Sequence, residues 1–528
     1  MPPPLSRRRT LALGLALSAT TSVALVTLAP QSPVQAGRAS SIDLETASIP
    51  QLRTLLDRRQ VTSEQLTRAY LDRITLLNTD GPSLNAVRAL NPQAVSEARE
   101  LDRQARRGAT RGPMYGIPVL VKDNIDVAGM PTTAGSIALQ GSVPVGDAPL
   151  VTQLRASGAV ILGKTNLSEF ANFTTAGMPS GYSSLGGQVL NPYDASQTPS
   201  GSSSGSGVAA ATGLAAVTVG TETSGSILSP AAANSLAAVK PTVGLISRTG
   251  VIPISATQDT AGPMTKTVYD SAALLSAMTG VDPQDPATAP SAPYVGTDYT
   301  RTLSTEALQG KRLGYVAPPT APNEQYVAAL DALRAQGATL VPVTVAGVTA
   351  PGILSYEFKR DLNAYFDRLP PQRALDTLTE VVAFNQGQAR LKFGQTLLVE
   401  SEAIDLEDPA TKATYQANRN LGLAQSRTAI DSVLTANNLD AIVSAQSTTG
   451  VGARAGYPTV IVPSGYGATN GRPTGLSFLG TAFDEADLLA YAYDYEQATM
   501  KRRPPSVINP TLFQCLAVAT GPQASCAP

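Results

Sequence analysis

The chain has 528 residues, of which 43% are hydrophobic and 15% charged, and a formal net charge of −1. This composition excludes a disordered chain and gives no indication of a nucleic-acid partner, because there is enough apolar material for a large core and no basic excess. The absence of histidine excludes Ser-His-Asp hydrolases and His-ligated metal sites, and the two cysteines near the C-terminus cannot build a zinc site, so we predict no metal and no cofactor.

The N-terminal segment has the features of an export signal. Three arginines at residues 7–9 precede an uncharged stretch rich in Ala, Leu and Val, and a small-residue site follows at residues 34–36. This pattern predicts a signal peptide over residues 1–36, and the paired arginines fit twin-arginine export. A membrane anchor is the less favoured alternative, because Pro30 and Pro33 end the apolar stretch. We expect a periplasmic or extracellular protein with no stable membrane span after signal removal.

Short apolar strands that end in polar residues come next along the chain. A capping-box sequence at residues 62–65 predicts the start of an amphipathic helix. Three strands then lead into polar residues, at 116–124, 159–166 and 215–226, and residues 166–171 are expected to begin a helix. Strand ends are where α/β proteins place catalytic groups, so these three segments are the candidate sites.

The second half of the chain continues the alternation of strands and helices. Further strands are predicted at residues 312–316, 339–345, 441–444 and 459–462, and helices at residues 323–335 and 484–500. Residues 350–435 have helical spacing and few strand signals, so we expect a helical cap beside the sheet. The predicted fold class is α/β, as a single large domain with a central mixed, mostly parallel twisted sheet covered by helices on both faces. It spans residues 37–510, and the tail, residues 511–528, contains Cys515 and Cys526, which could form a disulfide.

Two loops rich in Ser and Gly are candidates for catalysis. Residues 199–207 have the composition of a flexible linker, but the apolar run 208–219 follows directly, which is a core-like setting. Residues 224–226 lie just past a predicted strand end, where successive backbone N–H groups can converge on an anion. Because histidine is absent, the base for a serine nucleophile would have to be Lys, Asp or Glu.

Lys122, at the end of an apolar strand, is a candidate for that base. A lysine with its ordinary pKa near 10.4 is protonated at neutral pH, but burial can lower the pKa by several units. The alternative is a structural lysine that forms a salt bridge with a nearby carboxylate, such as Asp123 or Asp126.

Three motifs together resemble the amidase-signature family. They are G-I-P-x-x-x-K-D at residues 116–123, G-S-S-S-G-S at 201–206 and G-T-E-T-S-G-S-I at 220–227. The similarity extends over about residues 43–504 and is strongest to bacterial peptide amidases, which remove the C-terminal amide of peptides. It implies the amidase-signature fold and a Ser–cis-Ser–Lys catalytic triad.

The resemblance assigns the roles in this triad to three residues. Ser226 would be the nucleophile that forms an acyl-enzyme, and Ser202, preceded by a cis peptide bond, would relay a proton between Ser226 and Lys122. Ser203 would support Lys122 or Ser202 by hydrogen bonding. The oxyanion hole would be formed by backbone N–H groups of Thr223, Ser224, Gly225 and Ser226.

The same resemblance makes Lys164 structural, and Glu222 and Asp259 hydrogen-bonding supports. Residues 350–435 and residues near Asn172 are expected to line the pocket for a peptide or small-molecule amide. The implied function is an amidase that hydrolyses carboxamides, including the C-terminal amide of peptides. One alternative is the glutaminase component of a tRNA-dependent amidotransferase, against which the export segment argues. Another is a secreted binding protein that has lost catalysis, against which the intact triad argues.

Overall fold

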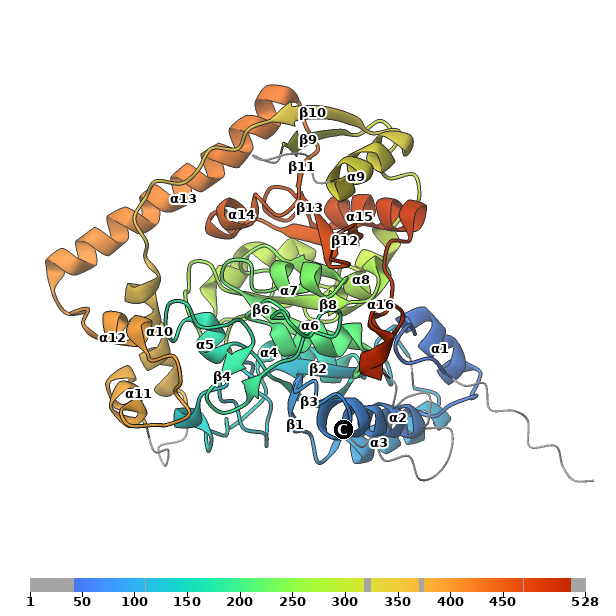
Figure 1. The fold of residues 1–528 in the computed structure, drawn as a ribbon, viewed down its shortest axis with the longest axis horizontal. Coiled ribbons are helices and arrows are strands. Elements are labelled where there is room, and N and C mark those ends of the chain that lie inside the picture. The colour runs from blue at the N-terminus through green and yellow to red at the C-terminus, as the bar shows by residue number, and fades with distance from the viewer. Residues whose placement is uncertain (1–41, 110, 318–323, 370–374, 469, 514–528) are drawn as a thin grey trace, which may run out of the picture. The chain divides into compact units, whose positions relative to one another are not determined.

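Eleven strands form the central sheet in the computed structural model of the protein (Figure 1). The structure describes residues 42–109, 111–317, 324–369, 375–468 and 470–513. The predicted signal peptide, residues 1–36, and both cysteines, Cys515 and Cys526, lie outside the described residues. Across the sheet the strands follow in the order β1 (Val87–Leu90), β3 (Val160–Thr165), β2 (Pro118–Lys122), β6 (Val217–Glu222), β8 (Thr260–Thr265), β7 (Ala237–Lys240), β12 (Thr459–Tyr466), β13 (Pro473–Leu479), β11 (Ala441–Ser444), β9 (Arg312–Val316) and β10 (Thr339–Val343).

The sheet is mixed, as predicted, but the prediction that it is mostly parallel is wrong. β2 runs parallel to both of its neighbours, β3 and β6, and β9 runs parallel to β10 and β11. The other neighbouring pairs are antiparallel, and they outnumber the parallel ones. Regular alternation of strands and helices favoured parallel pairing. However, within the residues that the structure describes no helix separates β7 from β8 or β12 from β13, and strands joined without a crossover helix can run antiparallel.

Four strands of the sheet, β1, β7, β8 and β13, lie outside the predicted strands. β8 contains Gly262 and Pro263, and β13 begins with Pro473, and these residue types weaken the sequence pattern of a strand. The predicted strands at the centre, β2, β3 and β6, are buried along their whole length. Burial on both faces is what parallel strands flanked by helices require. A separate small hairpin is formed by β4 (Tyr182–Ser183) and β5 (Gly187–Gln188).

Helices flank the sheet, and the helix predicted from the capping box is confirmed as α2 (Ser63–Ile74). Its first turn is closed by Thr62, whose hydroxyl accepts a hydrogen bond from the Gln65 N–H (3.1 Å) and whose N–H donates to Gln65 Oε1 (2.9 Å). The other helices outside the cap are α1 (Ile49–Asp57), α3 (Ala94–Arg106), α4 (Pro149–Ala156), α6 (Ser204–Ala211), α7 (Leu228–Ala233), α8 (Val268–Ser276), α9 (Glu324–Ala335), α14 (Thr449–Ala455), α15 (Glu485–Thr499) and α16 (Pro505–Ile508).

The helix expected to begin at residues 166–171 is instead a short turn, α5 (Glu169–Asn172). Phe170 and Ala171 have positive φ angles of 46° and 53°, so the backbone is left-handed there. Left-handed backbone costs energy for residues with a side chain and persists only where the surroundings enforce it, which a helical sequence pattern does not reveal.

The prediction that residues 350–435 are helical is confirmed. The described part of this cap contains α10 (Leu354–Phe366), α11 (Leu378–Asn385), α12 (Thr396–Glu402) and α13 (Pro409–Asn437). Figure 1 shows α10, α11 and α12 grouped together, with α13 leading away from them toward β9 and β10. Within the part of the chain that the structure describes, no helix has both the length and the apolar character needed to cross a bilayer.

Candidate active site

The sheet brings the three predicted motifs to one edge. β2 and β6 are parallel neighbours, with Val121 opposite Val219, so Lys122 at the end of β2 lies beside the last residues of β6. The run of Ser and Gly leads into α6, which packs against β6 through a hydrogen bond from Ser206 Oγ to the Val219 carbonyl (3.1 Å). Residues 202–211 are all buried, so this run is part of the core and not a flexible linker.

Lys122 is fully buried, and among the described residues its Nζ forms hydrogen bonds with uncharged groups and no ion pair. It lies 2.8 Å from Ser202 Oγ, 2.9 Å from Thr221 Oγ1 and 3.2 Å from the Thr221 carbonyl oxygen. Desolvation lowers the pKa of Lys122 to about 7, although the charges of Asp259 and Glu222 partly oppose that effect. A large fraction of the amine is therefore neutral at neutral pH, and a neutral amine has a lone pair that can accept a proton.

The alternative of a salt bridge between Lys122 and Asp123 or Asp126 is wrong. Asp123 pairs with Lys164, at 3.2 Å, and both side chains are buried. Asp126 accepts a hydrogen bond from the Tyr365 hydroxyl at 2.8 Å. Lys164 thus has the structural role expected of it, because its carboxylate partner stabilises the charged form.

Two short contacts position the loop that contains Ser202. The peptide bond between Gly201 and Ser202 is cis. The Ser202 carbonyl accepts a hydrogen bond from the Ser168 N–H, and the Ser203 N–H donates to the Ser226 carbonyl, both at 3.1 Å. The second of these bonds joins the loop of Ser202 directly to the loop of Ser226.

Thr221 is a site residue that the motifs did not single out. Ser203 was expected to contact Lys122 or Ser202, but its hydroxyl donates to the Thr221 carbonyl (3.0 Å) and accepts from the Thr221 N–H (3.2 Å). Support for the lysine is therefore indirect, through Thr221. Asn124 Nδ2 also donates to Thr221 Oγ1, at 3.0 Å. The pairing of β2 with β6 could have indicated Thr221, since it lies near Lys122 at the end of the neighbouring strand.

Glu222 shapes the loop that carries Ser226. Its carboxylate accepts hydrogen bonds from the N–H groups of Gly225 (2.7 Å), Ile227 (2.8 Å) and Leu228 (3.0 Å). This confirms Glu222 as a hydrogen-bonding support. It also corrects the predicted oxyanion hole, because the N–H of Gly225 already has an acceptor.

The remaining predicted oxyanion donors lie in a loop that Gln258 and Asp259 hold in place by hydrogen bonds to Thr223. Among the described residues, no hydrogen bond uses the N–H groups of Thr223, Ser224 or Ser226. Asp259 accepts a hydrogen bond from Thr223 Oγ1 at 2.5 Å, and Gln258 Nε2 donates to the Thr223 carbonyl at 3.2 Å. Asp259 is thus a support, as expected, and these contacts leave three backbone donors available for a developing negative charge.

Asn172, the predicted substrate-binding residue, lies at the end of the left-handed turn α5. Its φ is 74°, its side chain is exposed, and its N–H donates to the Ser168 carbonyl at 3.3 Å. Because Ser168 contacts Ser202, the turn adjoins the candidate site. Contact between Asn172 and a substrate stays a prediction.

Comparison with known proteins identifies the family. The family model Amidase matches residues 65–449. A probable amidase of Arabidopsis thaliana is 40% identical over 492 residues, which cover 89% of this chain and 93% of that protein. A glutamyl-tRNA(Gln) amidotransferase component of Chloroflexus aggregans is 33% identical over 502 residues, covering 87% of this chain and 97% of that component.

A solved structure gives the same assignment. The X-ray structure of the native peptide amidase from Stenotrophomonas maltophilia is similar to this fold, with a TM-score of 0.83 and 45% sequence identity over 87% of this chain and 98% of that one. The match of family, fold and site motifs agrees with the resemblance found in the sequence. The chain belongs to the amidase family and is an amidase, a hydrolase of carbon–nitrogen amide bonds.

Proposed function

We propose that this amidase removes the terminal amide of peptides through an acyl-enzyme formed on Ser226, with Ser202 and Lys122 as a proton relay. The observation that carries the proposal is a buried lysine that has no ion-pair partner among the described residues and lies 2.8 Å from Ser202 Oγ. A charged structural lysine would be expected to have a carboxylate partner, as Lys164 has in Asp123.

The acylation step follows from this arrangement. Ser226 Oγ attacks the amide carbon, its proton passes to Ser202, and the Ser202 proton passes to the neutral amine of Lys122. The carbonyl oxygen becomes negatively charged and is stabilised by the free N–H groups of the loop at residues 223–226. When the carbon–nitrogen bond breaks, the proton returns through the relay to the leaving nitrogen, which departs as ammonia.

Deacylation repeats the relay with water. Water attacks the ester carbon of the acyl-enzyme, and one of its protons passes along the relay to Lys122. As the bond between that carbon and Ser226 Oγ breaks and the carboxylic acid leaves, the proton returns to Oγ and restores the hydroxyl. In each step the Ser202 hydroxyl accepts one proton and donates another. Lys122 is the base that histidine would be in other serine hydrolases.

A peptide amide is the proposed substrate because of the similarity to the Stenotrophomonas maltophilia peptide amidase. The expected result is that an amidated peptide is converted to the free acid with its internal peptide bonds intact, measured by mass spectrometry of the products. In water enriched in oxygen-18, the new carboxylate should gain the label. The same peptide with a free C-terminal carboxylate is the control and should remain uncleaved.

The similarity to amidotransferase components supports one competing function, the release of ammonia from glutamine for a partner protein. Ammonia release from free glutamine, measured with and without an added partner beside the peptide assay, distinguishes the two functions. Ammonia production from free glutamine that required an added partner, together with no turnover of amidated peptides, would contradict the proposal.

The pH dependence of the reaction tests the lysine base. Because Lys122 has a pKa of about 7 and must be neutral to accept a proton, kcat/KM is expected to fall about tenfold per pH unit below that value and to level off above it. Initial rates on one amidated peptide across a buffer series provide the measurement. A level profile across this range would contradict the role of the lysine.

Asp259 provides a control for the assignment of this titration, because burial raises its own pKa to about 6. Its negative charge raises the pKa of Lys122, so Asp259→Asn is expected to move the acid limb to lower pH while the limb itself persists. If the limb instead vanished in this variant, Asp259 and not Lys122 would be the titrating group.

A further inference from the structure

A cavity of about 370 Å³ lies between the helical cap and the turn that follows Ser168. Its size falls in the range of pockets that bind small ligands. Its walls come from the turn, from the start of α10, from α12 and from α13. They include Phe173, Ile353, Tyr356, Leu397, Thr414 and Tyr415.

One wall of this cavity is connected to Ser202. Phe173 follows the left-handed turn α5, and the turn begins next to Ser168, whose N–H donates to the Ser202 carbonyl. The ring of Phe173 lies against Phe358 of α10, with ring centroids 4.9 Å apart. The turn therefore joins Ser168, which contacts Ser202, to Phe173, which lines the cavity.

The wall formed by α13 is connected through Glu357 to the loop at residues 255–259. The Tyr415 hydroxyl donates to Glu357 Oε1 at 2.7 Å, and Thr257 Oγ1 donates to the same oxygen at 2.6 Å. Glu357 is fully buried and also accepts a hydrogen bond from Ser255 Oγ. The loop that contains these two residues continues to Asp259, which holds Thr223.

The chemistry of the walls selects an apolar ligand. Among the described residues that line the cavity none is charged, and the rings of Tyr356 and Tyr415 stack with their centroids 4.1 Å apart and an interplanar angle of 7°. The hydroxyl of Tyr415 donates to Glu357 and accepts a hydrogen bond from Arg360 Nη1 at 2.8 Å, so the ring edges and the aliphatic side chains are what the wall offers. Such a wall favours aromatic and aliphatic groups over polar ones.

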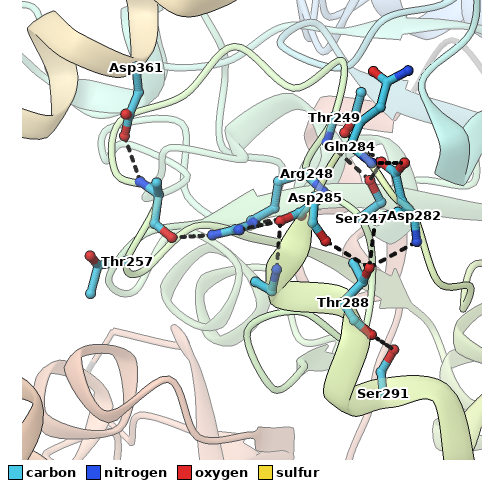
Figure 2. A network of polar contacts seen from close by, with 12 residues as sticks. Ser247, Arg248, Thr249, Thr257, Asp282, Gln284, Asp285, Thr288, Ser291 and Asp361 are labelled. Carbon is cyan, nitrogen blue, oxygen red and sulfur yellow. Dashed lines mark hydrogen bonds and ion pairs between the residues drawn. The ribbon is translucent and has the colours of Figure 1, made fainter.

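A second cavity, of about 240 Å³, has five charged residues in its lining, Arg248, Asp259, Asp285, Asp361 and Arg368, and Arg248 pairs with Asp285 within the protein (Figure 2). Arg248 donates to Asp285 through Nε (2.9 Å) and Nη2 (2.5 Å) and also donates to the Ala256 carbonyl. Asp361 accepts a hydrogen bond from the Ala256 N–H at 2.8 Å. Because these groups hold the loop in place, the apolar cavity is the better candidate for binding substrate.

We propose that the apolar cavity binds an aromatic or aliphatic side chain of the acyl part of the amide substrate. This inference rests on the proposed function and adds a substrate class to it: amides whose acyl group carries a large apolar side chain. Phe173, in one wall, follows the turn that begins at Ser168, which contacts Ser202. Tyr415, also in the lining, is linked through Glu357 to residues 255–259, which contact Thr223. An occupied cavity would thus fix the acyl group between the relay and the backbone donors.

The test fills the cavity from an exposed helix position. Thr414→Phe places a ring in the cavity, and Ala413→Phe, on the same helix and not lining the cavity, is the matched control. The substrates are N-acetyl-phenylalaninamide and N-acetyl-glycinamide. Thr414→Phe is expected to lower kcat/KM for the phenylalanine amide about tenfold or more, mainly through KM, and to change the glycine amide less than about twofold. Ala413→Phe should leave both values close to those of the unmodified enzyme.

The outcomes separate this inference from the function on which it rests. Hydrolysis of both amides by the unmodified enzyme with equal kcat/KM, or an equal loss on both in Thr414→Phe, would overturn the cavity assignment alone. If the unmodified enzyme hydrolysed neither of the two amides, the proposed function and this inference would both be overturned. If Thr414→Phe unfolds at a lower temperature than Ala413→Phe, Asn418→Phe fills the same cavity from the next turn of α13 and has the same expected results.

Discussion

Replacing Ser226 with alanine is expected to lower kcat for amide hydrolysis about 10⁶-fold, the scale found when a serine hydrolase loses its nucleophile. Without Oγ no acyl-enzyme can form, and Ser202 cannot replace it, because its hydroxyl lies against Lys122 Nζ at 2.8 Å within the buried site. Ammonia release from an amidated peptide measures the effect. A rate close to that of the unmodified enzyme would contradict the assignment of Ser226.

Covalent labelling gives this prediction a second measurement. A serine-reactive fluorophosphonate is expected to label Ser226 in the unmodified enzyme and to leave the Ser226→Ala variant unlabelled, as shown by peptide mass mapping. Ser229→Ala, a substitution three residues further along, is the matched control and should retain both labelling and turnover. Complete absence of labelling in the unmodified enzyme would instead favour a binding protein that keeps the fold without its chemistry.

Replacing Lys122 with methionine is expected to lower kcat by a factor of about 10²–10⁴, the usual contribution of a general base. Methionine fills a similar space without an amine, so the relay loses its proton acceptor while the packing is largely kept. Lys122→Arg should be similarly inactive, because a guanidinium remains protonated at every accessible pH. Substantial turnover by either variant would show that the proton leaves the serines by another route.

The stability of the same variant tests the burial of the amine independently of catalysis. The pKa of Lys122 is about 7 in the folded protein and near 10.5 in the unfolded chain, so between these values only the unfolded state holds the proton. The free energy of unfolding of the unmodified enzyme, relative to Lys122→Met, should therefore rise with pH across this window, by up to about 1.4 kcal/mol per pH unit. Lys240 and Lys266, also buried with pKa values lowered to about 8, are present in both proteins and cancel in the comparison. Urea unfolding at several pH values provides the measurement, and a constant difference would contradict a neutral buried lysine.

The sequence predicted the position of Lys122 and Ser202 well because strand ends and family motifs carry local signals. It missed Thr221, because the contact between this residue and Lys122 depends on which strands are neighbours in the sheet. Local sequence periodicity does not determine the order of the strands. It also assigned the Gly225 N–H to the oxyanion hole. That group is used by Glu222, a bond that only the path of the loop reveals.

The same division applies to the fold. α2, the cap helices and the central strands have strong periodic patterns, and they were predicted. β8 and β13 contain Pro and Gly, and their pairing with distant strands overrides the weak local preference. Residues 166–171 have a helical pattern, yet Phe170 has left-handed backbone, a conformation that depends on neighbouring segments and that a local pattern does not show.

The tight packing of α6 has a consequence for how such an enzyme can diversify. A Cβ atom on Gly205 would overlap backbone atoms of Ala86 and Asn166, and one on Gly220 would come within 2.8 Å of Ser203 Oγ. These two positions leave no room for a side chain, so we expect substitutions that change the preferred amide to fall elsewhere, as in the cap helices. An engineer would therefore randomise the cap and keep Gly205 and Gly220 unchanged.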